Sequence, residues 1–199
     1  MLKLLYDNNI RREAMRHAQH MVATSYGLGR TFWSYKGGRN NNDETAYLGK
    51  IAEIVVANYF KDSRLQIDKS PLDKEAYEHP ETNFNSDFII NGHTIELKTK
   101  TINALPLGSY DIGTTRISES ELYLFSRVWD ERGFLFIVGW LPTSEFRARA
   151  VHRQKGSQVV NSQESSFICL SNEWVCKINQ LRESQSLIRF LLNVSGAAV

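Results

Sequence analysis

The sequence predicts an α/β protein in which helices flank a β-sheet, and three observations carry this prediction. Apolar residues recur at the helical period over residues 8–25 and over residues 43–61. Two runs rich in β-branched and apolar residues flank Asn91-Gly92, which is the strongest short-range signal for a two-residue hairpin. Near-continuous apolar runs at residues 122–128 and 134–140 are typical of central strands that are covered on both faces.

The chain has 199 residues, which is enough for one well-buried core and too few for two. We therefore expect a single domain over residues 1–199. No run approaches the roughly 18 apolar residues of a membrane span, and the N-terminus lacks a signal-peptide pattern. These features predict a soluble cytoplasmic protein with no membrane partner. Cys169 and Cys176 form neither a disulfide framework nor a zinc pattern, so they are expected to be buried or partly buried free thiols.

The helix expected over residues 43–61 carries a charge in an apolar environment. From Ile51 to Phe60 it is apolar nearly all round, which indicates burial on more than one side. Glu53 lies inside this run, and an isolated buried carboxylate is strongly unfavourable because it loses its water. Glu53 is therefore expected to find a cation, a metal or a proton. Lys50, three residues earlier, is one candidate cation, so a purely structural Glu53–Lys50 pair is one interpretation.

The register of the expected hairpin follows by counting outward from Asn91-Gly92. Side chains alternate along a strand, so Glu96 and Lys98 share one face and their neighbours point the other way into a core. Asp87 would lie opposite Glu96, with Cβ atoms about 4.5–5.5 Å apart, where like charges are destabilising. Such a pair needs a cation, a raised pKa or solvent, and two carboxylates suit Mg²⁺ or Mn²⁺. The expected pairs are Ile90–His93, Ile89–Thr94, Phe88–Ile95 and Asp87–Glu96, and the expected core residues are Phe88, Ile90, Ile95 and Leu97.

The remaining segments give weaker signals. Residues 101–120 and 157–166 are rich in turn-forming or polar residues and are predicted as loops. Residues 65–67 indicate a short strand, residues 174–178 a longer one, and residues 180–194 a C-terminal helix. The apolar side of that helix could form a homodimer, and it consists of Leu181, Leu187, Ile188, Leu191 and Leu192.

The net charge of +2 does not demand a nucleic-acid partner, but the cations are unevenly distributed. Residues 1–39 are strongly basic, and residues 147–155 hold four cations and no acid. Segregated charge of this kind suits a phosphate-binding face beside an acidic metal site, although solvated surface cations would give the same pattern. The candidate DNA-binding residues are Lys36, Arg39, Lys100, Arg147, Arg149, Arg153 and Lys155.

An Asp, a short gap and then Glu-x-Lys on a hairpin resembles the PD-(D/E)XK nuclease superfamily, which has the restriction-endonuclease-like fold. The matching residues are Asp87, Glu96 and Lys98, while Ser86 stands where the family usually has proline. The family also places a glutamate on the helix before the hairpin, and Glu53 is the matching position. The order of helix, hairpin and two further strands over residues 43–146 is similar to its core. The strand ending in Gly-Trp-Leu-Pro, followed by a short helix and a basic stretch, resembles phage and archaeal-virus members.

The resemblance implies a mixed central sheet of about four to five strands, with helices 8–25 and 180–194 as additions to the core. It also implies Mg²⁺- or Mn²⁺-dependent hydrolysis of phosphodiester bonds in DNA. Asp87 and Glu96 would hold the metal together with the Leu97 carbonyl. Glu53 would bind a second metal or position a hydrated one. Lys98 would orient or deprotonate the attacking water. The enzyme would be a restriction-like endonuclease or a Holliday junction resolvase, and it could be virus-encoded.

Two other interpretations remain open from the sequence. A non-catalytic DNA-binding or assembly protein could retain the nuclease fold without cleaving DNA. A phosphatase of unrelated fold could use Asp87, and it would have no hairpin at Asn91-Gly92. Within the nucleases, restriction-type, junction-resolving and exonucleolytic members share this core, so the sequence leaves the DNA structure that is cleaved open.

Overall fold

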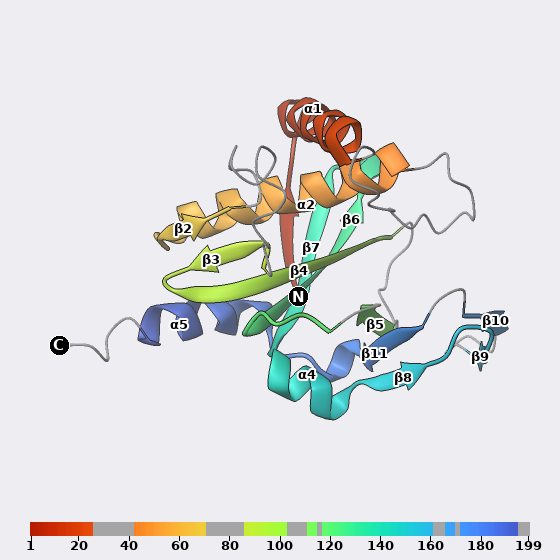
Figure 1. Cartoon of the computed structure of the whole chain (residues 1–199). Coiled ribbons are helices and arrows are strands. Elements are labelled where there is room, and N and C mark those ends of the chain that lie inside the picture. Colours follow the sequence, from red (N-terminus) through yellow and green to blue (C-terminus); the bar gives the residue numbers. More distant parts are fainter. Residues whose placement is uncertain are drawn as a thin grey trace.

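The computed structural model describes residues 1–25, 42–70, 86–102, 111–114, 117–160, 166–169 and 172–194. Its centre is a six-stranded sheet in the order β1-β7-β6-β4-β3-β2 (Figure 1). The sheet is mixed, because β4 pairs with β6 in parallel and the other neighbours are antiparallel. The strands are β1 Leu2–Leu5, β2 Ile67–Lys69, β3 Phe88–Ile90, β4 His93–Thr101, β6 Leu122–Trp129 and β7 Phe134–Pro142. The helices of the described part are α1 Asn8–Ser25, α2 Asn42–Asp62, α4 Thr143–Arg149 and α5 Ser184–Val194.

The α/β class with a mixed sheet flanked by helices is confirmed, but the predicted four to five strands are too few. The additional pairing comes from the sheet edges, where β1 joins β7 and the three-residue β2 joins β3. The strand predicted at residues 65–67 is found as β2, two residues later, whereas no strand is predicted where β1 lies. Both strands are short, so long-range pairing decides their limits.

The hairpin β3–β4 has the predicted turn and the three predicted pairs nearest to it, whereas the predicted Asp87–Glu96 pair is not part of the ladder. Asn91 and Gly92 both have positive φ, 48° and 80°, as a type I′ turn requires. The paired residues are Phe88–Ile95, Ile89–Thr94 and Ile90–His93. The ladder ends at Phe88, so Asp87 lies one residue beyond the paired part of the hairpin. The alternative of a fold without this hairpin is therefore wrong.

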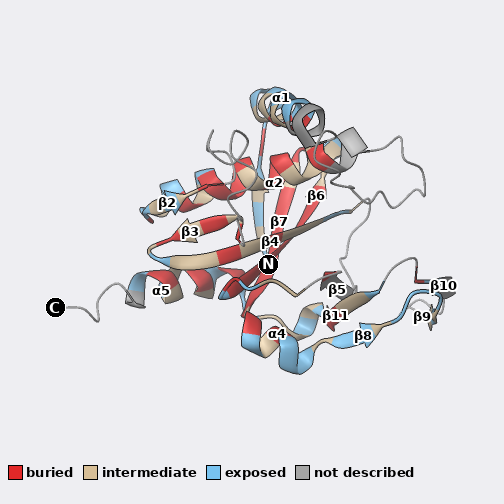
Figure 2. Ribbon diagram, in the orientation of Figure 1, coloured by how far each residue is buried: buried red, intermediate tan, exposed pale blue. Residues whose placement is uncertain are grey.

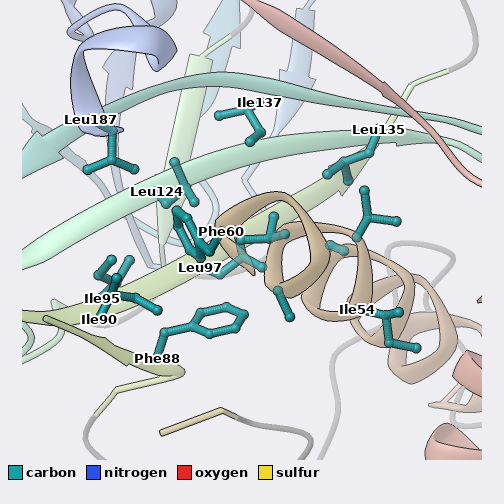
Figure 3. Packing of buried hydrophobic residues seen from close by; sticks show 14 of the residues in the cluster. Ile54, Phe60, Phe88, Ile90, Ile95, Leu97, Leu124, Leu135, Ile137 and Leu187 are labelled. Atoms are coloured by element: carbon teal, nitrogen blue, oxygen red, sulfur yellow. The ribbon is translucent and has the colours of Figure 1, made fainter. Parts of the chain in front are cut away.

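One face of the sheet packs against α2, as the apolar helix predicts. Phe60 of α2 meets Phe88 of β3 edge to face, with ring centroids 5.8 Å apart, and Figure 3 shows both rings in the same cluster as Ile95 and Leu124. Each fully buried side chain of this size contributes about 1.5–3 kcal/mol to folding. The predicted core residues Phe88, Ile90, Ile95 and Leu97 are all buried. Figure 2 shows the buried stripe of α2 turned towards the sheet.

The opposite face of the sheet carries a second apolar cluster. Tyr123 and Phe125 of β6 contact Phe146 of α4, with ring centroids 4.8 and 5.7 Å away. A three-stranded sheet in the order β5-β11-β8 contributes Cys176 to this cluster. Its strands are β5 Asp111–Thr114, β11 Glu173–Lys177 and β8 Val151–Arg153. Strands β6 and β7 are buried along almost their whole length, which confirms them as central strands.

Two segments predicted as loops contain strands instead. Residues 111–114 form β5, and β9 Gln158–Val160 pairs with β10 Ser166–Ile168. β5 contains aspartate and glycine, which are depleted in strands, whereas β9 and β10 contain good strand formers but have only three residues each. Pairing with β11, rather than local preference, explains β5.

The C-terminal helix α5 begins at Ser184 and not at residue 180, because Ile178–Gln180 form a 3₁₀ turn. Its residues Leu187 and Leu191 are buried in the same core as α2, and only Leu192 is strongly exposed, at 45 %. The apolar side considered for a homodimer is thus largely covered by the chain itself. Both cysteines are free and buried, as expected. Within the described residues, no helix is long and apolar enough to cross a membrane.

Candidate active site

Three acidic side chains from different elements interact electrostatically near the end of the hairpin, and we name Glu53, Asp87 and Glu96 the carboxylate cluster. The pKa of Asp87 is raised to about 7. Burial is the largest cause of this rise, and the negative charges of Glu96 and Glu53 add to it. Two of the predicted acids, Glu53 and Glu96, are thus near enough to Asp87 for their charges to act on it.

The end of the hairpin explains how Asp87 is held. The Asp87 amide donates to the Ile95 carbonyl at 3.0 Å, and the Leu97 amide donates to Asp87 Oδ2 at 2.7 Å. If β3 continued, the Leu97 amide would bond to the backbone of that strand. Here it bonds to the Asp87 carboxylate instead. The N–H and C=O of one strand residue point to the same side. The Leu97 carbonyl therefore points to the side of β4 on which β3 has ended, together with Asp87.

Lys98 forms an ion pair with Glu96 on the same face of β4, as the alternation predicts. The Lys98 side chain is 32 % exposed and the Glu96 side chain 16 % exposed. Burial lowers the pKa of Lys98, but the carboxylates of Glu96 and Asp87 outweigh burial and hold that pKa above its usual value. Lys98 is consequently a cation at neutral pH that faces several carboxylates.

The sequence left two interpretations of Glu53 open, an ion pair with Lys50 and a position beside the hairpin, and the structure is consistent with both. The Lys50 ammonium lies 2.5 Å from Glu53 Oε2, and the two side chains are 5 % and 16 % exposed. Burial raises the pKa of Glu53, and the neighbouring Lys50 charge only partly offsets this rise. At the same time the charge of Glu53 acts on Asp87. The structural pair and the place beside the hairpin are therefore compatible.

Ser118 and Tyr123 belong to the same surroundings, and the sequence reasoning missed both. The Ser118 hydroxyl donates to Glu96 Oε2 at 3.2 Å, and the Ser118 amide donates to the Tyr123 hydroxyl at 2.5 Å. Tyr123 lies beside Glu96 because the two residues pair in the parallel ladder of β4 and β6. That ladder joins segments far apart in sequence, so no local pattern could have identified these residues. The signal that could have found Tyr123 is the β4–β6 register.

The basic residues predicted to contact DNA have different environments. Lys36 and Arg39 lie outside the described residues. Lys100 is exposed on β4, on the same face as Lys98, and pairs in register with Arg127 of β6. Lys100 therefore continues the charged face of the strand away from the carboxylate cluster.

Four further cations form the basic segment, residues 147–155, and the structure separates them. Arg147 is exposed on α4, and its charge lowers the pKa of the Tyr123 hydroxyl in opposition to the larger effect of burial. Arg149 instead lies 2.7 Å from Glu145 and also donates to the Gln180 carbonyl.

Arg153 lies 3.7 Å from Glu173. Lys155 is exposed in the turn after β8, where its amide donates to Asn172 Oδ1 at 2.8 Å. Of the four cations, Arg147 is thus the one whose charge is shown to act on the surroundings of the carboxylate cluster.

The donor set fits a small divalent cation. Asp87 and Glu96 supply carboxylate oxygens and Leu97 a carbonyl oxygen, which are the ligands that Mg²⁺ and Mn²⁺ prefer. A cation beside the carboxylates would offset the two effects that raise the pKa of Asp87, which are burial first and then the charges of Glu96 and Glu53. Across the part of the chain that the structure describes, no three His, Cys, Asp or Glu side chains lie close enough to hold a metal by themselves. The fitting set is therefore two carboxylates with one backbone carbonyl.

Comparisons with known proteins give no match: no protein-family model matches the chain, and no significant similarity is found to a curated protein or a solved structure. The geometry and charge of the carboxylate cluster and Lys98 are therefore the basis for a functional conclusion.

Proposed function

We propose that this protein is a metal-dependent nuclease of the PD-(D/E)XK type that hydrolyses phosphodiester bonds in DNA. The observation that carries the proposal is that the charges of Glu53 and Glu96 act on the buried Asp87, while Lys98 forms an ion pair with Glu96. Strongly perturbed carboxylates beside a lysine are typical of catalytic sites, because a structural role gains nothing from concentrated like charge.

The arrangement of elements supports a restriction-endonuclease-like core. The helix α2 covers the sheet that contains the hairpin β3–β4, and β6 lies parallel beside β4 with β7 next to it. This is the order of helix, hairpin and two further strands that the resemblance implies. Asp87 lies at the point where the hairpin strands separate, and its Oδ2 accepts the Leu97 amide of β4 there.

Asp87, Glu96 and the Leu97 carbonyl would hold the metal ion. When bound, Mg²⁺ or Mn²⁺ would supply an activated water and neutralise charge on the scissile phosphate. The chain's own residues do the positioning: Ser118 and Lys98 each bond a different oxygen of Glu96, so its carboxylate has a defined orientation. The Lys98 ammonium, held in its charged form, would orient the attacking water and offset charge on the phosphoryl oxygens.

Cations beyond the cluster would hold the DNA backbone. Lys100 extends the charged face of β4, and Arg147 lies on α4 on the side of Tyr123. Contacts of this kind position a duplex without reading its sequence. We therefore propose an endonuclease of restriction-like or junction-resolving type, in which the carboxylate cluster cleaves and the cations bind flanking phosphates.

The test is nicking of supercoiled plasmid in Mg²⁺ by the wild type, Glu96→Ala and Lys98→Ala. Each variant is expected to lose at least about 100-fold in rate, because each removes a group that acts on the transition state. Glu131→Ala and Lys61→Ala are matched controls, since both residues are exposed and lie on other elements. Unchanged cleavage by Glu96→Ala or Lys98→Ala would reject the site. DNA binding without any cleavage by the wild type would favour the non-catalytic alternative.

A panel of DNA substrates then defines the type of nuclease. Linear duplex, flap, four-way junction and single-stranded DNA of the same sequence are compared at equal concentration. Preferred cleavage of the junction would identify a resolving enzyme, and cleavage of circular plasmid would identify an endonuclease. Cleavage only from DNA ends would contradict the endonuclease proposal.

A further inference from the structure

The ion pair next to the carboxylate cluster bears on how many metal ions the site can hold. Lys50 and Glu53 lie three residues apart on α2, so the helix places both on one side. Lys50 Nζ is 2.5 Å from Glu53 Oε2, and the Lys50 side chain is 5 % exposed. A lysine this deeply buried depends on its partner, because an ammonium without its counter-charge is strongly unfavourable in the protein interior.

The position of Lys50 is set from more than one side. Its charge lowers the pKa of His17 on α1, after the larger effect of burial, so the ammonium lies near enough to α1 to act on that residue. Small side chains, Ala18 of α1 and Ala46 of α2, allow these two helices to approach each other. Lys50 is thus a buried cation whose charge acts on Glu53 and on the neighbouring helix.

A second metal ion at Glu53 would conflict with this arrangement. Glu53 would have to share or release the oxygen that Lys50 contacts, and release would separate the buried ammonium from this counter-charge. If Lys50 stayed, a doubly charged ion and an ammonium would lie within a few ångströms of each other in a region of low dielectric. Either outcome opposes binding of the second ion.

We infer that the site holds one divalent ion per chain, bound by Asp87, Glu96 and the Leu97 carbonyl, and that the Lys50 ammonium takes the place of a second ion beside Glu53. This inference depends on the proposed metal-dependent function. Glu53 then acts as a positioning residue: it binds Lys50 and contributes negative charge near Asp87, but it does not ligate metal.

The direct test counts Mn²⁺ bound to the full-length wild type by the loss of the free-ion signal in electron paramagnetic resonance. One Mn²⁺ per chain is the expected result. Two per chain would overturn the inference and leave the proposed metal site intact. No bound Mn²⁺ at millimolar concentration would reject the metal site, and with it the proposed nuclease, so the two failures are distinct.

Variants of Lys50 test whether this residue limits the site to one bound metal ion. Lys50→Gln frees the Glu53 carboxylate and is expected to bind two Mn²⁺, whereas the control Lys50→Arg keeps the charge and binds one. A single ion in Lys50→Gln would remove Lys50 from the explanation and overturn the inference.

A double variant tests the role of Glu53 without leaving a buried charge unpaired. Lys50→Met with Glu53→Met replaces the ion pair by apolar side chains, which folded proteins often tolerate. Circular dichroism verifies that it folds. The variant is expected to bind one Mn²⁺ with an affinity within about threefold of the wild type. A loss of tenfold or more would show that Glu53 ligates the ion and would overturn the inference.

Discussion

The carboxylate cluster and the basic segment are both concentrations of charge, yet the structure treats them in opposite ways. In the basic segment, Arg149 and Arg153 are partnered by Glu145 and Glu173 at 2.7 and 3.7 Å. In the carboxylate cluster, Glu53 and Glu96 are also paired, with Lys50 and Lys98, but the pKa of the buried Asp87 is raised to about 7, first by burial and then by the charges of Glu96 and Glu53. Opposite charges that pair need nothing further, whereas concentrated like charge remains costly until a ligand neutralises it.

This difference distinguishes the charged residues with a structural role from those that we propose to act in catalysis. The basic stretch looked uniform in sequence, and pairing leaves Arg147 as the cation whose charge acts near the carboxylate cluster. The acids match the motif of a nuclease family, and the raised pKa of the buried Asp87 supports a chemical role for them. The contrast predicts effects of decreasing size at Lys98, Asp87, the two arginines and Ser118.

The largest effect is expected at Lys98. Lys98→Gln keeps a polar side chain, one atom shorter than that of lysine, but removes the charge that faces Glu96 and Asp87. We expect kcat to fall by about 100- to 10 000-fold, the usual range for a group that acts on a proton or charge in the transition state. KM for DNA should change little. Single-turnover cleavage of a labelled duplex separates the two quantities, and a defect confined to KM would place Lys98 in DNA binding instead.

Asp87 should make the metal-free protein less stable as the pH rises. Its folded pKa of about 7 lies above its ordinary value of 3.8, so between these values the folded state holds a proton that the unfolded state has released. Stability from this group is therefore complete below pH 3.8 and is lost as the pH rises through 7, by at most about 1.4 kcal/mol per unit.

Asp87→Asn removes this dependence and should raise the free energy of unfolding at pH 8 by roughly 1–3 kcal/mol relative to the wild type. Urea denaturation at pH 5 and pH 8 in the presence of a chelator measures the effect. Saturating Mg²⁺ should stabilise the wild type at pH 8 but not the variant. An identical pH dependence in both proteins would mean that the like charges are already compensated.

Arg147 is expected to contribute to DNA binding, and Arg153 to the stability of the fold. Arg147→Ala is expected to weaken DNA binding about three- to tenfold and to reduce the salt dependence by about one phosphate contact, with unchanged melting temperature. Arg153→Ala breaks a partly buried ion pair and should cost about 0.5–1 kcal/mol of stability. Fluorescence anisotropy at several salt concentrations and thermal melts measure both. Equal loss of DNA affinity in the two variants would make the basic segment a single binding surface.

The smallest effect is expected at Ser118. Ser118→Ala removes one hydrogen bond to Glu96 Oε2, which is worth about 1 kcal/mol, so kcat should fall about fivefold. Ser118→Thr keeps the hydroxyl and should restore most of the rate. If both variants cleave at the wild-type rate, Ser118 does not orient Glu96 for catalysis.

The sequence could anticipate those parts of the site that depend on local rules. Asn91-Gly92 determined the turn, and counting from it placed Glu96 and Lys98 on one face, because side chains alternate strictly along a strand. Glu53 was recognisable as a charge inside an apolar helix. Its two alternatives, a lysine partner and a place beside the hairpin, could not be separated, because the packing of α2 on the sheet decides both.

By itself, then, the sequence determined the α/β class, the long helices, the central strands and the register of one hairpin, since these follow from periodicity and turn chemistry over a few residues. Only the tertiary structure decided that β1 and β5 are strands, that Tyr123 lies beside Glu96, and that Arg149 and Arg153 are paired. Each of these depends on contacts between residues far apart in the chain. The energies that select such contacts come from packing and charge pairing, which local sequence does not contain.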